Sequence, residues 1–101
     1  MRSRDEAHWK IEEEIRAEKA ATLGRAGERL EAALAEIHRL RHALDETPAS
    51  PRRRHLLDEY REARARALDA RHTLLIQREA IGLRNHRTVD HHFPEPPTIE
   101  R

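Results

Sequence analysis

Eight histidines in 101 residues are the side chains that most readily suggest chemistry. His86, His91 and His92 lie close together near the C-terminus, where a loop could bring imidazoles onto a metal ion or a haem. His38 and His42 are four residues apart and would share one side of a helix, but no third ligand accompanies them. The alternative is an ordinary polar tail. Metal or haem binding is therefore a secondary hypothesis, and we expect no cofactor.

Arginines form the second cluster with possible chemistry. Arg52, Arg53 and Arg54 stand where a helix is expected to begin, a position at which the helix dipole disfavours cations. They could bind a phosphate there, or a nucleic acid or ribosome together with Arg61 and neighbouring arginines. The net charge is only +1, whereas nucleic-acid binders normally carry a stronger basic bias. Ion pairing with nearby acids is the favoured interpretation, and nucleic acid is a possible partner but not the favoured one.

Catalytic groups are scarce. The chain has no cysteine, and its two serines, Ser3 and Ser50, stand where helices are expected to start. The three glycines are dispersed and form no phosphate-binding loop. A hairpin of this size also offers no deep pocket by itself. We therefore expect a protein that is not an enzyme.

Helices must position these residues, because Ala, Leu, Glu and Arg dominate the composition. Apolar residues recur every seven positions from Leu23 to Leu44, and Pro48 then disfavours continuation of the helix. Ser50 and Pro51 form a helix start, and Gly82 is a helix end. The sequence predicts an all-α, coiled-coil-like antiparallel hairpin over residues 1–82, with helices at 4–46 and 51–82 and a turn at 47–50. Ser3 is the expected N-cap of the first helix, and residues 83–101 are predicted to be an extended tail rich in His and Pro.

Matching the two apolar stripes across the short turn gives a hairpin core in which large residues face small ones. The predicted core residues are Leu23, Leu30, Leu34, Ile37, Tyr60, Ala67, Leu74 and Ile81. Helix 51–82 also has an apolar shoulder about 100° from its main stripe, formed by Leu57, Leu68 and Leu75. One partner helix cannot bury both strips. We expect these three residues and Leu40 to form the interface of a homodimeric four-helix bundle; the alternative is a monomer whose tail covers the shoulder.

Two further segments need a partner. In the predicted register, residues 4–15 project beyond the second helix and carry Trp9, Ile11 and Ile15. The tail is the other, with Val89, Phe93 and Ile99 as its expected anchors. Its prolines favour the polyproline II conformation, which suits docking either onto its own bundle or in a groove of another protein. Either the tail or another chain is expected to cover the projecting helix end.

These patterns favour a small, bacterial interaction or scaffold protein that self-associates through its hairpin and contacts a partner through its tail or its basic second helix. Nucleic-acid binding and metal or haem binding are the alternatives. The length is similar to that of helical-hairpin proteins of the WXG type, but the turn lacks Trp-x-Gly, so no family follows. No run approaches 18 apolar residues, and the first residues lack a signal-peptide pattern, so we expect a cytoplasmic protein without a membrane span.

Overall fold

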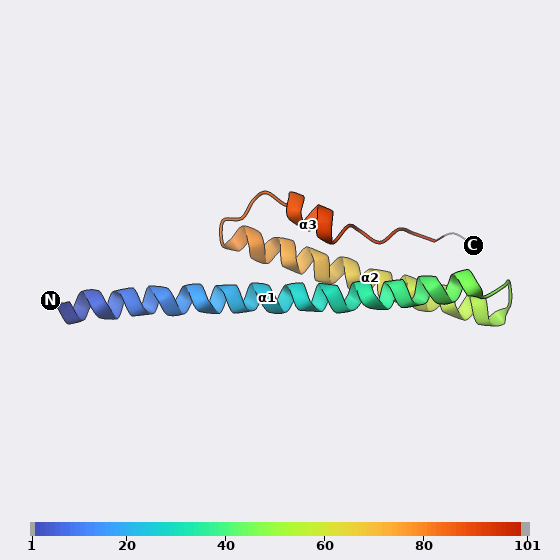
Figure 1. Ribbon diagram of the computed structural model, residues 1–101, viewed down its shortest axis with the longest axis horizontal. Helices are drawn as coiled ribbons and strands as arrows, with labels where there is room; N and C mark the ends of the chain where they lie inside the picture. The colour runs from blue at the N-terminus through green and yellow to red at the C-terminus, as the bar shows by residue number, and fades with distance from the viewer. Residues whose placement is uncertain (1, 100–101) are drawn as a thin grey trace.

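The computed structural model describes residues 2–99 and contains three α-helices: α1 (Arg2–Glu46), α2 (Pro51–Ala80) and α3 (Arg87–His92). No β-strand occurs among these residues. α1 and α2 pack side by side as an antiparallel hairpin, and α3 with the segment after it runs back along α2 towards the hairpin turn (Figure 1). The molecule measures 74 × 21 × 15 Å, because the 45-residue α1 extends well beyond α2.

The boundaries of α2 follow from local capping. Ser50 Oγ accepts a hydrogen bond of 3.1 Å from the backbone N–H of Arg53, and Pro51 occupies the first helical position. At the other end Gly82 has a φ of 90°, and the Leu83 N–H donates to the carbonyl of Arg78 at 2.9 Å. This pattern is a Schellman cap. The cap predicted at Gly82 is therefore present, although the helix itself ends at Ala80.

Two boundaries differ from the sequence prediction. α1 already begins at Arg2, so Ser3 lies inside the helix and does not cap it. The segment predicted to be extended contains α3, because residues 87–92 include no proline or glycine and the first tail proline is Pro94. The side-chain oxygen of Asn85 accepts from the backbone N–H of Arg87 at 3.0 Å at the start of this helix. Residues 94–99 have no regular secondary structure.

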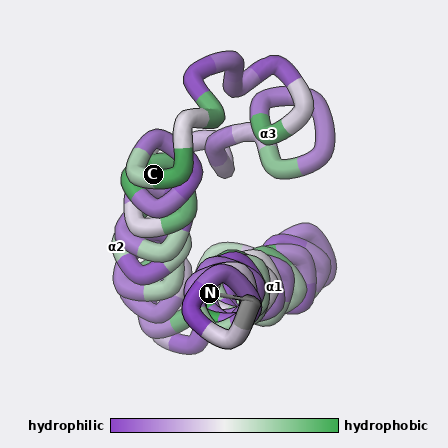
Figure 2. Tube along the Cα trace, turned by 90° about the vertical axis from the view of Figure 1, so that its left-hand side faces the viewer, coloured by the Kyte–Doolittle hydropathy of each residue, from purple (hydrophilic) through white to green (hydrophobic). Residues whose placement is uncertain are grey.

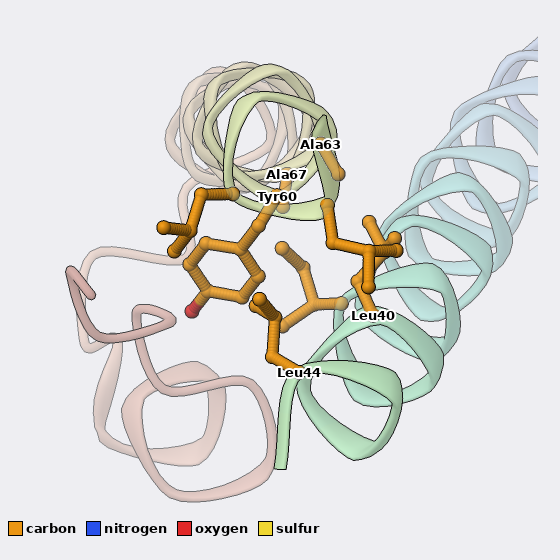
Figure 3. Packing of buried hydrophobic residues seen from close by; sticks show 8 residues of the cluster. Leu40, Leu44, Tyr60, Ala63 and Ala67 are labelled. Atoms are coloured by element: carbon orange, nitrogen blue, oxygen red, sulfur yellow. The ribbon is translucent and has the colours of Figure 1, made fainter. Parts of the chain in front are cut away.

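The core is apolar and forms two clusters along the hairpin. The cluster near the turn is centred on Tyr60, whose ring packs among residues of both helices (Figure 3). The second cluster joins the middle of α1 to the end of α2 and includes Val89 of α3. Of the predicted core, the buried residues are Leu30, Ile37, Tyr60, Ala67 and Leu74, and the half-buried ones are Leu23 and Leu34.

Ile81 does not belong to this core. Its side chain is 36% exposed, because Ile81 is the C-cap residue where the chain leaves α2. Figure 2 views the molecule along its length and colours the chain by hydropathy. Apolar positions alternate with polar ones along both long helices, and α3 forms a third element beside the hairpin. The hairpin therefore positions two distinct features, a docked C-terminal segment and a projecting end of α1.

Candidate interaction surfaces

A row of arginines on α2 holds the C-terminal segment. Arg64, Arg71 and Arg78 are spaced seven residues apart, so they share one side of the helix. Each donates a hydrogen bond to a backbone carbonyl of the returning chain, in antiparallel order: Arg64 Nε to Pro96 at 2.9 Å, Arg71 Nε to Phe93 at 2.9 Å, and Arg78 Nη2 to Asn85 at 3.0 Å. Sequence analysis did not identify this row, although its regular spacing was a visible signal.

Arg71 is well enclosed, with a side chain only 11% exposed. Its Nη2 donates to Asp90 Oδ1 at 2.5 Å, and its Nη1 lies 3.7 Å from a carboxylate oxygen of Glu95. The buried Tyr60 adds a further contact, because its hydroxyl donates to the Pro97 carbonyl at 2.5 Å. Figure 3 shows this hydroxyl directed at the C-terminal segment. The tail is therefore held mainly through its own backbone.

Apolar anchors complete the docking of the tail on its own hairpin. Val89 is 3% exposed within the second cluster, and half-buried Phe93 packs against the same cluster. Half-buried Ile99 packs against the cluster near the turn. Pro96, between them, is buried. All three predicted anchors thus contact the hairpin of the same chain.

This docking corrects the predicted dimer interface. Leu40 and Leu57 are 1% and 6% exposed and belong to the cluster near the turn, so they are not available to a second copy. Leu75 is half-buried and packs against the second cluster, which includes residues of the tail. Leu68 is also half-buried. Leu40 and Leu57 are thus taken up by the hairpin core, and the C-terminal segment packs against the same cluster as Leu75.

The arginines at the start of α2 have different roles. Arg53 is half-buried and donates through Nη1 to the carbonyls of Leu44 and Thr47, the latter at 3.0 Å. Carbonyls in the last turn of a helix lack intrahelical hydrogen-bond partners, so Arg53 supplies a donor to the carbonyls at the end of α1. Arg52 and Arg54 are exposed. The three do not point together at one anion, and Arg53 already has an internal role.

Arg61, the fourth residue of the possible nucleic-acid surface, lies 3.5 Å from Asp58 on the exposed side of α2. Arg53, Arg64 and Arg71 are bound to groups of the same chain, whereas Arg61 and several other arginines of α2 are exposed. Nucleic-acid binding through these exposed arginines stays a prediction.

The three tail histidines do not converge. Nε2 of His86 lies 2.9 Å from a carboxylate oxygen of Glu79, while the rings of His91 and His92 meet edge to face with centroids 5.1 Å apart. Within residues 2–99, no group of three or more His, Cys, Asp or Glu side chains is placed to hold a metal ion. The structure therefore provides no geometry in favour of the metal hypothesis.

One exposed ion pair has a clear electrostatic effect. Arg39 donates to both carboxylate oxygens of Glu36, at 2.5 and 2.9 Å. This hydrogen bonding lowers the pKa of the Glu36 carboxyl below its ordinary value of 4.5 and raises the pKa of Arg39. Both side chains face solvent, so the pair is a surface feature of α1.

The projecting end of α1 is uncovered. Every residue from 3 to 21 is exposed, including Trp9 at 60%, Ile11 at 55% and Ile15 at 44%. We call residues 3–21 the free segment. The tail runs the other way, towards the hairpin turn, so the suggestion that it covers the free segment is wrong (Figure 1).

A shallow groove marks the point where the free segment leaves the hairpin. It encloses about 310 Å³ between α1 and the end of α2. Its floor and walls come from both helices: Ile15, Glu18, Lys19 and Thr22 on one side, and Gln77, Ala80 and Ile81 on the other. The apolar surface of the free segment therefore continues into a groove at the edge of the packed hairpin.

Comparisons with protein-family models, characterised proteins and solved structures found no significant match. Among residues 2–99, neither long helix has the length of apolar sequence that a membrane crossing requires. The chain's own geometry is therefore the basis for any functional proposal.

Proposed function

We propose that the protein is a small non-enzymatic interaction protein that self-associates through the free segment of α1. One observation carries this proposal: three large apolar side chains, Trp9, Ile11 and Ile15, are exposed on a helix that continues into a packed hairpin. Ile11 and Ile15 are four residues apart and share one side of the helix, whereas Trp9 lies on another side. Exposed apolar side chains that lie close together are typical of interaction sites. The expected interface moves from the shoulder of α2 to this helix end.

The free segment also has a reason to need a partner. Isolated helices shorter than about 12–15 residues are only marginally stable in water, and most helices in proteins depend on tertiary packing. Every residue from 3 to 14 of the free segment is exposed. A second copy is the simplest partner, because each molecule brings the same uncovered surface and a two-fold axis lets each surface cover the other.

The docked tail supports this choice of surface. The shoulder of α2 is occupied by Val89, Phe93 and Ile99 of the same chain, and the hairpin core is closed. Ile76 belongs to α2 and not to the free segment, and it serves as an internal comparison because it is 51% exposed. The free segment is the place where exposed apolar side chains and an adjoining groove occur together.

Sedimentation equilibrium over a range of protein concentrations tests the proposal. We expect the parent protein to dimerise, and Ile11→Lys to remain monomeric, because a charged side chain replaces an apolar group at the centre of the free segment. Ile76→Lys is the matched control, with nearly equal exposure in the single chain, and should dimerise like the parent. A monomeric parent, or equal dimerisation of both variants, would overturn the proposal.

A further inference from the structure

A stripe of side chains on α1 leads from the free segment into the groove at the edge of the hairpin. Its positions are separated alternately by four and three residues, so they lie on one side of the helix. The stripe consists of Arg4, His8, Ile11, Ile15, Glu18 and Thr22. Its last three members also line the groove of about 310 Å³. A helix that packs along this stripe therefore also lies in the groove.

The lining of the groove is both apolar and polar. Ile15, Ala80 and Ile81 supply its apolar surface, and Ile15 and Ile81 are 44% and 36% exposed. Glu18 and Lys19 are charged and exposed, and Thr22 and Gln77 complete the lining. An occupant without polar groups would remove these charges from water and give nothing in return. The groove therefore suits a segment with an apolar residue opposite Ile15 and a polar one opposite Glu18.

The free segment of a second copy has this pattern when it runs antiparallel. Ile11 then faces the partner's Ile15, and this pairing places Glu13 beside the two-fold axis. The same register brings the partner's His8 opposite Glu18, where the imidazole can donate a hydrogen bond to the carboxylate. In the single chain His8 is exposed and its Nε2 lies 3.0 Å from Glu12, so the ring is already within reach of an acid at the helix surface.

A parallel pair is less favourable. It places each member of the stripe level with its own copy, so Arg4 meets the partner's Arg4 and Glu18 meets the partner's Glu18. Like charges that face each other across an interface oppose association. The acidic residues at 12–14 are level with their own copies in either orientation, so they favour neither. The charges of the stripe therefore favour the antiparallel pair.

We propose that the free segments of two copies pair antiparallel and that each copy places its residues 4–11 in the groove of the other. This inference rests on the proposed self-association and specifies how the two copies fit together. α1 is continuous from Arg2 to Glu46, so residues 4–11 extend from the hairpin as part of one helix. The dimer contains two equivalent grooves, each formed by α1 and α2 of one copy and filled by α1 of its partner.

A distance between two spin labels tests the orientation. The chain has no cysteine, so Gly24→Cys provides a single attachment site, and a Cβ at this position meets no atom within 4 Å. In the antiparallel pair residue 24 lies level with the partner's residue 2. At 1.5 Å per residue, and with helix axes 8–10 Å apart, the two labelled backbones are about 35 Å apart. A parallel pair gives about 10 Å.

Substitutions at the end of α2 test the groove. Ile81→Lys puts a charge into the groove lining and should weaken dimerisation at least about tenfold in sedimentation equilibrium. Leu83→Lys is the matched control, because Leu83 is 41% exposed and does not line the groove. This control should dimerise like the parent. Circular dichroism confirms that both variants keep their helices.

The outcomes separate this inference from the proposed function. A parent that dimerises, with labels about 35 Å apart and a defect only in Ile81→Lys, supports both. A parent that dimerises and loses dimerisation in Ile11→Lys, but has labels about 10 Å apart or an unaffected Ile81→Lys, retains self-association through the free segment and overturns the antiparallel arrangement in the groove. A monomeric parent overturns both.

Discussion

Replacing Arg71 with alanine is the most direct perturbation of the docked tail. The Arg71 side chain is 11% exposed, and its Nε donates at 2.9 Å to the carbonyl of Phe93, a kind of hydrogen bond that contributes about 1.5–3 kcal/mol when the donor is charged. Its two carboxylate partners are about two-thirds exposed, at 66% for Asp90 and 63% for Glu95, so water screens them and they add little. We expect Arg71→Ala to lower the free energy of unfolding by about 2 kcal/mol.

Urea denaturation followed by circular dichroism measures this change. Arg66→Ala, on the exposed side of the same helix, is the control and should lie within about 0.5 kcal/mol of the parent. Arg71→Lys keeps the charge but loses the planar arrangement of donors, so its stability should fall between the two. The reasoning is refuted if Arg71→Ala and Arg66→Ala have the same stability, or if Arg71→Lys matches the parent.

Three smaller perturbations test other contacts. Tyr60→Phe keeps the buried ring but removes the donor to the Pro97 carbonyl, and denaturant titration should show a loss of about 1 kcal/mol. Gly82→Ala meets no atom within 4 Å but places a side chain at a φ of 90°, so thermal unfolding should show a loss of about 1 kcal/mol from backbone strain alone. Glu36→Gln removes the ion pair with Arg39 and should slightly lower the melting temperature at neutral pH. Because the folded-state pKa of Glu36 is lowered, that contribution is present above the ordinary value of 4.5 and is lost as the pH falls through the folded pKa. The difference between parent and Glu36→Gln should therefore disappear in acid.

The hairpin could be predicted from the sequence because local rules specify it. Pro48 ends one helix, Ser50 and Pro51 begin the next, and Gly82 provides the left-handed residue that ends it. The seven-residue spacing of apolar side chains identified most of the core, including the fully buried Leu30. Each of these signals acts within a few residues or along one helix face, so none requires knowledge of distant contacts.

The cover of the hairpin could not be predicted in the same way. An apolar shoulder at Leu57 and Leu75 shows that something must pack there, but its residues are equally suited to a second copy or to the chain's own tail. Arg64 and Arg71 hold the tail through its backbone carbonyls. Every residue has such a carbonyl, so the residue types of the tail do not reveal these contacts. Only the regular spacing of the arginines hinted at their shared role.

Placement of the tail also changes where self-association is expected. Once Leu57 is buried by the chain itself, the free segment still exposes Trp9, Ile11 and Ile15, while other exposed apolar side chains lie on and after α2. The expected dimer interface thus moves from α2 to the free segment because the chain returns along α2.

Amide hydrogen exchange, resolved by segment and repeated at low and high protein concentration, is the most direct test. Docking of the tail within one chain predicts that residues 87–93 are protected equally at every concentration. Pairing through the free segment predicts that residues 3–14 exchange rapidly in dilute protein and slow down as the concentration rises. The opposite pattern, with tail protection that depends on concentration and a free segment that does not respond, would contradict the account.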